Sequence, residues 1–225
     1  MFHERKSGVA VHRSLAGGNA GDTYTGQAYG DDTICPVCNG LHPIFETQQV
    51  YEVARTIVDC IIGGPTMMVG VLRSNDGRYF AACSPANASD GYNAFIGAVT
   101  GTHKRFLPSL TIAGNIPDDG TRSRGGLPLN ATFIRSCKVN GSPMAGRCAA
   151  PKLLHFAIKN LLPRPWVMSE VMYDPAGTSL AYRDYITAPS CSTCAVLLPY
   201  MVCPRKQHAN LQEFTGLIRN QWGGW

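Results

Sequence analysis

Hydrophobic positions recur along this chain at spacings that predict regular elements from about residue 44 onward. Apolar residues three or four positions apart predict a helix over 47–62, which ends at a Gly-Gly pair. Two apolar runs on either side of Ser-Asn-Asp-Gly predict a β-hairpin over 67–83. Later patterns predict a helix over 151–162, a strand over 166–173, a short apolar helix over 191–199 and an amphipathic helix over 210–220.

The stretches between these elements divide the chain. Residues 1–43 are polar and rich in glycine and show no period of 2 or 3.6, so we expect an N-terminal arm followed by one domain over 44–225. Residues 84–147 hold many Gly and Pro and only short apolar pieces, which predicts a long irregular insertion. The order helix, hairpin, insertion, helix, strand, helix favours an α/β fold in which helices pack on a small sheet.

Composition excludes several classes of protein. The chain has 225 residues, of which 44% are hydrophobic and 16% charged, so it can bury the core of one globular domain. The longest apolar run, 194–203, is too short for a membrane-spanning helix and contains Pro199. The first 14 residues lack the apolar segment of a secretory signal. We therefore expect a monomer in the cytoplasm with no membrane partner.

The net charge of +5 is unevenly distributed. Ten Lys and Arg residues and only two acids lie between Gly91 and Ser169, which gives this stretch a charge of +8. Such a stretch is either a nucleic-acid-binding surface or a solvated basic face, and the sequence leaves both open. If it binds nucleic acid, the candidate contacts are its interleaved cations and rings, Tyr92, His103, Arg105, Phe106, Arg122 and Arg124.

Nine cysteines, an odd number, suggest reduced thiols and metal chemistry before disulfides. The first Cys-x-x-Cys pair, Cys35 and Cys38, could form a zinc knuckle with His42 and with Cys60, in addition to the metal site described next. Ordinary free thiols or a disulfide are the alternatives for that pair, because no second pair accompanies it.

A second constellation points to an open metal site. Cys148 directly precedes the helix predicted over 151–162, and Cys191 and Cys194 lie in the first turn of the helix predicted over 191–199. Positive helix ends favour thiolates, and three thiolates leave the fourth position of a zinc ion free, as in catalytic sites. A closed structural site, with Cys203, His155 or His208 as fourth ligand, is the alternative.

These residues carry a resemblance to a known family. Arg-Cys148-Ala-Ala150-Pro-Lys-Leu-Leu together with Pro-Ser190-Cys191-Ser-Thr-Cys194 resembles the zinc-dependent nucleoside and nucleobase deaminases, in particular the Cys-Ala-Glu-Pro branch among bacterial toxins. The resemblance implies a cytidine-deaminase-like layered domain and Zn²⁺ on Cys148, Cys191 and Cys194. Ser190 displaces the Pro of the family's Pro-Cys-x-x-Cys by one position, and because it adjoins Cys191 we expect it at the pocket floor. The resemblance further implies conversion of cytosine to uracil in nucleic acid, DNA rather than RNA, delivery as a toxin into a target cytoplasm, and an immunity protein as partner.

Position 150 departs from that family. The family has a Glu there that shuttles protons, whereas this chain has Ala150, so we expect the chain as written to be inactive or nearly so. The nearest acids, Asp119 and Glu170, are not expected to replace it. The retained ligands favour an engineered silencing change over a natural pseudoenzyme. Two further functions stay open: a deaminase of free nucleosides or nucleotides, and an inactive zinc module that binds nucleic acid or a partner.

Overall fold

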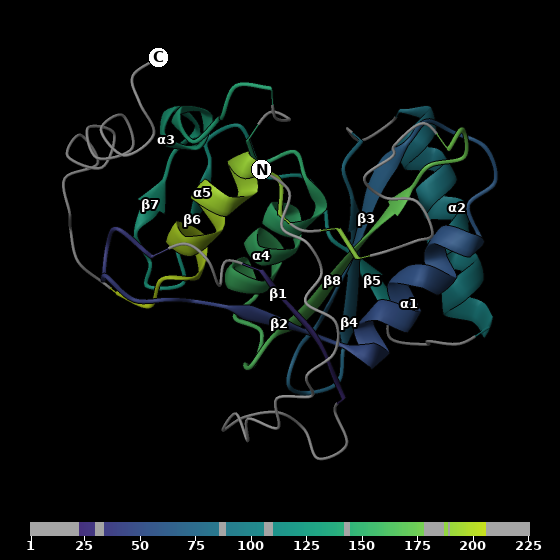
Figure 1. Cartoon of the computed structure of the whole chain (residues 1–225), viewed down its shortest axis with the longest axis horizontal. Helices are drawn as coiled ribbons and strands as arrows, with labels where there is room; N and C mark the ends of the chain where they lie inside the picture. Colours follow the sequence, from purple (N-terminus) through teal and green to yellow (C-terminus); the bar gives the residue numbers. More distant parts are fainter. Residues whose placement is uncertain are drawn as a thin grey trace.

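The helices and strands of the computed structural model form a mixed α/β architecture (Figure 1). The structure describes residues 23–29, 34–85, 89–105, 110–141, 145–177, 187–188 and 190–205. Its elements in chain order are β1 (Tyr24–Tyr29), β2 (Ile44–Thr47), α1 (Gln48–Asp59), β3 (Met67–Arg73), β4 (Tyr79–Cys83), α2 (Asp90–Arg105), β5 (Leu110–Ile112), β6 (Thr121–Arg122), β7 (Pro128–Leu129), α3 (Ala131–Ser136), α4 (Ala149–Lys159), β8 (Val167–Tyr173) and α5 (Ser192–Val202).

A four-stranded mixed sheet lies at the centre, with strand order β5-β4-β3-β8. β3 is antiparallel to β4 and β8, whereas β4 and β5 are parallel. Because side chains alternate along a strand, Val69 and Val71 pack into one buried cluster with α1 and α2, and Leu72 packs into another with α4 and α5. Figure 1 shows the sheet between these two helix pairs. The expected small mixed sheet flanked by helices is confirmed.

The first turn of α4 lies unusually close to the sheet because β3 carries a glycine at the contact. A Cβ on Gly70 would lie 2.9 Å from Ala149 Cβ and 2.9 Å from Leu153 Cδ1. Gly70 also pairs with Glu170 of β8 in the antiparallel register. The glycine therefore allows the start of α4 to reach the strand that carries Glu170.

A buried carboxyl group attaches the N-terminal strand pair to the central sheet. β1 and β2 form a separate two-stranded antiparallel sheet, and β2 carries Glu46. Thr25 and Ser169 each donate a hydroxyl hydrogen bond of 2.6 Å to Glu46, and Thr187 donates one of 3.1 Å. Burial raises the pKa of Glu46, and these hydroxyl donors oppose that rise. This network connects the N-terminal segment to β8.

Most of the elements predicted from periodicity are confirmed: the first helix, the hairpin, α4, β8 and α5. The expectation that residues 84–147 are irregular is wrong, because this stretch contains α2 and also β5, which extends the central sheet. Three glycines, Gly91, Gly97 and Gly101, lower the intrinsic helix propensity of α2. Packing of Phe95 and Ala98 in the core with α1 stabilises the helix instead.

Some sequence predictions lie outside the described residues: the helix over 210–220, His208, Phe106 and the first part of the arm. Within the described parts of the chain, no helix is both long and apolar enough to cross a membrane.

Candidate metal centre

Three cysteine thiols meet where the N-termini of α4 and α5 converge. Cys148 is the N-cap residue of α4, Cys191 is the N-cap residue of α5, and Cys194 lies in the first turn of α5. The sulfur atoms of Cys148 and Cys191 are 3.7 Å apart, and all three sulfurs lie within 4.8 Å of one another. The structure thus brings together the three residues that the sequence singles out as ligands.

The spacing of these sulfurs fits a tetrahedral metal ion. Zinc–sulfur bonds of about 2.3 Å at tetrahedral angles place two sulfurs about 3.8 Å apart. The observed 3.7 Å between Cys148 and Cys191 agrees with that value. No fourth His, Cys, Asp or Glu of the described chain joins this group, so a bound ion would keep one position for a non-protein ligand.

Electrostatics at this centre favour a thiolate on Cys191. Hydrogen bonds from the thiols of Cys148 and Cys194, together with backbone N–H donors at the start of α5, lower the pKa of Cys191 to about 3. The hydrogen bond from the Cys148 thiol to Cys191 raises the pKa of Cys148, because the proton stays on the Cys148 sulfur. A divalent cation would displace the remaining protons and leave three thiolate ligands.

Ala150 lies in the first turn of α4 and is fully buried. Its backbone N–H donates a 2.9 Å hydrogen bond to Oε1 of Glu170. β8 therefore carries the carboxyl group of Glu170 to the backbone of Ala150. Glu170 is the one acid of this strand, Val-Met-Ser-Glu-Val-Met-Tyr, and that was the sequence signal for it.

Glu170 is 2% exposed and titrates abnormally. Burial raises its pKa to about 8, the N–H of Ala150 opposes the rise, and the negative charge of Cys191 adds to it. Burial therefore favours the neutral form of this carboxyl group in the folded chain.

Lys152 is the one buried lysine of the described chain, at 3% exposure. Its ammonium group donates hydrogen bonds of 2.6 Å and 2.9 Å to the carbonyl oxygens of Cys83 and Pro85. Burial lowers the pKa of Lys152. These bonds fix the first turn of α4 against the end of β4, which adds rigidity next to Cys148.

The structure places the residues predicted to contact substrate in different parts of the fold, and among the residues it describes only one of them lies beside the thiols. Ser190 directly precedes Cys191, and its hydroxyl is shielded from solvent without a hydrogen-bond partner among the described residues. Tyr92 is half-buried on α2, its ring 6.4 Å from that of Phe95. His103 and Arg105 belong to α2, but their side chains lie outside what the structure describes. Ser190 is thus the candidate contact that lies beside the thiols.

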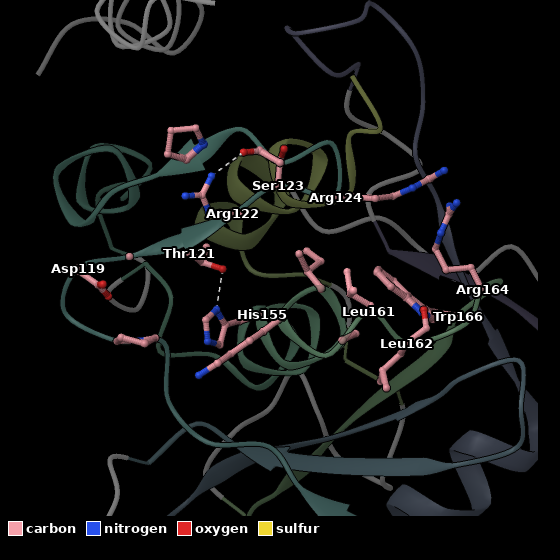
Figure 2. A pocket seen from close by; sticks show the side chains of 17 residues that line it. Asp119, Thr121, Arg122, Ser123, Arg124, His155, Leu161, Leu162, Arg164 and Trp166 are labelled. Atoms are coloured by element: carbon pink, nitrogen blue, oxygen red, sulfur yellow. Dashed lines mark hydrogen bonds between the residues drawn. The ribbon is translucent and has the colours of Figure 1, made fainter. Parts of the chain in front are cut away.

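Arg122 and Arg124 line a different feature, a pocket of about 800 Å³ beside the C-terminal half of α4 (Figure 2). Its charged lining comprises four cations, a histidine and one acid: Arg122, Arg124, Lys159, Arg164, His155 and Asp119. None of the three thiols is among its lining residues. Figure 2 also shows Trp166 beside Arg164, whose guanidinium carbon lies 6.0 Å from the ring centre. The pocket is therefore basic with an aromatic wall.

His155 is a pocket residue and not a ligand of either cysteine group. Its Nδ1 lies 2.6 Å from the hydroxyl of Thr121, and Figure 2 shows this hydrogen bond across the pocket. His155 is half-buried on α4.

The N-terminal pair of cysteines also belongs to a group. Cys35, Cys38 and His42 lie together with Cys203, and their four donor atoms are within 4.8 Å of one another. Cys203 therefore belongs to this group and does not close the first one. Cys60, the other candidate fourth ligand, lies at the end of α1 outside the group. Both groups could hold a metal ion.

No family model matches this chain, and neither a curated protein nor a solved structure is similar enough to count as a match. The case for a function therefore depends on the geometry of these two cysteine groups and of the basic pocket.

Proposed function

We propose that the chain is a zinc-dependent deaminase of the cytidine-deaminase-like fold, which converts cytosine to uracil in nucleic acid, and that Ala150 leaves it nearly inactive. The observation that carries this proposal is the meeting of three thiols at two helix N-termini, with Ala150 two residues after Cys148. An open three-sulfur site is the arrangement of catalytic zinc.

Cys148, Cys191 and Cys194 would hold the zinc ion. When bound, zinc supplies the Lewis acidity that makes a nucleophile from water at neutral pH. The chain itself contributes the positive ends of α4 and α5, which stabilise the thiolates, and the rigid contact of α4 with Gly70 and the Lys152 ammonium. These contacts hold Cys148 in place relative to Cys191.

Deamination also needs a group that moves protons to the base and to the departing ammonia. In the family that the motif resembles, this is the Glu two residues after the first ligand. The methyl group of Ala150 can neither give nor take a proton. The carboxyl group of Glu170 is bound to the backbone N–H of the same residue, so Glu170 holds the start of α4 and does not take the place of the missing side chain.

The basic stretch supplies the argument for a polymeric substrate. The pocket beside α4 collects four of its cations and has Trp166 on one wall, and cations interleaved with aromatic rings suit phosphates and unstacked bases. DNA is proposed over RNA from the family resemblance.

The proposal is tested by restoring the carboxylate. Ala150→Glu, loaded with zinc, is incubated with single-stranded DNA, duplex DNA, RNA and free cytidine, and the products are sequenced or separated by chromatography. We expect uracil in DNA, with a rate that falls as salt is raised because phosphate contacts are salt-sensitive.

Reaction with free cytidine alone, at a rate independent of salt, would make the chain a nucleoside deaminase. Retained zinc and salt-dependent DNA binding, with no product from any substrate, would make it a binding module and overturn the enzymatic proposal.

A further inference from the structure

Four donor atoms converge between the N-terminal segment and the end of α5. They are the sulfurs of Cys35, Cys38 and Cys203 and a ring nitrogen of His42, all within 4.8 Å of one another. Cys38 Sγ and His42 Nε2 are 2.9 Å apart. Three cysteines and one histidine form one of the usual donor sets of structural zinc.

The loop that carries the first two sulfurs has the geometry of a metal-binding turn. The Asn39 N–H donates to the Cys35 carbonyl at 2.8 Å, and the Cys35 N–H donates to the Gly40 carbonyl at 2.9 Å. Asn39 adopts a left-handed conformation with φ of 57°, which closes the turn. The backbone N–H groups of Val37 and Cys38 are directed at the Cys35 sulfur. Donors aimed at a sulfur stabilise its thiolate form.

Two of the three cysteines of this group are fully buried. Cys35 is 0% exposed. Cys203 is 1% exposed, receives the backbone N–H of Arg205 on its sulfur, and shares hydrogen bonds with Cys35. A group of buried thiols with backbone donors aimed at their sulfurs is suited to a divalent metal.

We propose that Cys35, Cys38, His42 and Cys203 bind a second, structural zinc ion, which fastens the N-terminal segment to the C-terminal end of α5. Four protein donors complete a tetrahedral shell, so this ion has no open position for water or substrate. Three thiolates and Zn²⁺ carry a net charge of −1, and the Arg124 guanidinium, which interacts electrostatically with His42 and Cys203, compensates that charge.

The ion would order more than the two segments that bind it. The loop after β6 donates two backbone hydrogen bonds to the end of α5, from Arg124 to Met201 at 2.7 Å and from Gly125 to Cys203 at 2.8 Å. A Cβ on Gly125 would overlap the Arg205 carbonyl, so only glycine permits this approach. Because Arg124 lines the basic pocket, the second ion would also support that wall of the pocket.

Zinc per folded full-length chain is the direct measurement, with the metal counted by mass spectrometry. We expect two ions in the unmodified chain, one in Cys203→Ser and one in Cys191→Ser. Cys60→Ser is the matched control: it removes a half-buried cysteine outside both groups and should keep two ions. In Cys203→Ser, limited proteolysis should cleave the N-terminal segment earlier than in Cys60→Ser.

A second variant covers the case in which Cys203→Ser does not fold. His42→Cys keeps four donors, so it should retain two ions and, after cobalt substitution, show stronger sulfur-to-cobalt charge transfer. In a Cys191→Ser background, the cobalt spectrum should stay unchanged when azide is added, because the remaining site is closed.

Two zinc ions in Cys203→Ser, no zinc in Cys191→Ser, or unchanged charge transfer in His42→Cys would each overturn the second site. None of these results depends on deamination, so this proposal and the proposed function fail separately.

Discussion

The two ends of α5 carry cysteine groups of opposite character. At its start, Cys191 and Cys194 join Cys148 in a three-sulfur group that two helix N-termini flank. Beyond its last turn, Cys203 joins three donors of the N-terminal segment in a four-donor group. Among the residues that the structure describes, the first group would leave one position of a bound metal ion free, and the second would not.

The pKa of one thiol, Cys191, distinguishes the open group from the closed one. Hydrogen bonds from neighbouring thiols and helix N–H groups lower the pKa of Cys191 to about 3, whereas burial raises that of Cys35 to about 12. The pKa values of Cys148 and Cys194 are raised as well, so either group would reach its full set of thiolates only with a bound cation. We infer that the first group serves chemistry and the second serves structure.

Gly70→Ala should disturb the open group most strongly and leave the closed group intact. The added Cβ would meet Ala149 Cβ and Leu153 Cδ1 at 2.9 Å, which forces α4, and with it Cys148, away from the sheet. We expect a loss of about 1–3 kcal/mol of unfolding free energy and of one of two zinc ions, measured by denaturation and metal counting.

Gly97→Ala on α2 is the control for Gly70→Ala, because its Cβ meets nothing within 4 Å. It should keep both ions and gain roughly 0.5–1 kcal/mol, since alanine is the better helix former. Equal destabilisation by the two changes, or loss of the Cys203 ion in Gly70→Ala, would contradict the separation of the two groups.

Glu170→Gln tests the carboxyl group beside the open group through pH. In the folded chain the pKa of Glu170 is raised from its ordinary 4.5 to about 8, so between these values the folded state holds a proton that the unfolded state has lost. The contribution of Glu170 is therefore greatest below pH 4.5 and is lost as pH rises to about 8. Glutamine keeps the acceptor for the Ala150 N–H and does not titrate.

The unfolding free energy of Glu170→Gln relative to the unmodified chain should accordingly increase by about 3–4 kcal/mol between pH 5 and pH 8. Thermal unfolding across that range measures it. A difference that is constant with pH would show that Glu170 is ionised throughout.

Arg124→Gln should have the smallest effect, a weakening of nucleic-acid binding. The side chain lines the basic pocket and lies close to the closed group. Removing one phosphate contact should weaken DNA binding a few-fold and lower the slope of log affinity against log salt by about 1. Lys138→Gln, in the same basic stretch but outside the pocket lining, is the control and should leave the slope unchanged.

The sequence predicted the parts of the fold in which period and turn chemistry agree. The hairpin of β3 and β4 is an example, because apolar runs flank a Ser-Asn-Asp-Gly turn. The sequence pattern did not predict α2, because its glycines weaken the helical pattern and its stability comes from tertiary packing of Phe95 and Ala98. Local patterns do not contain that information.

Local sequence patterns also predicted only those parts of the two cysteine groups that do not depend on tertiary contacts. The three-sulfur group was predictable because Cys148, Cys191 and Cys194 each adjoin a predicted helix start, and helix starts carry a known charge. Cys203 was not assigned to Cys35 and Cys38, since 165 positions of sequence separate it from Cys38 and only the path of α5 brings it there. The position of Glu170 likewise depends on the pairing of β3 with β8.

The central claim is that the open group is the metal centre of a deaminase that lacks only its proton carrier. The most direct measurement is the rate of uracil formation in single-stranded DNA by zinc-loaded Ala150→Glu, with Ala150→Gln as a control of equal size. We expect Ala150→Glu to exceed both Ala150→Gln and the unmodified chain by about 10²–10⁴-fold. Equal rates in the three proteins, each with zinc on Cys148, Cys191 and Cys194, would contradict the account.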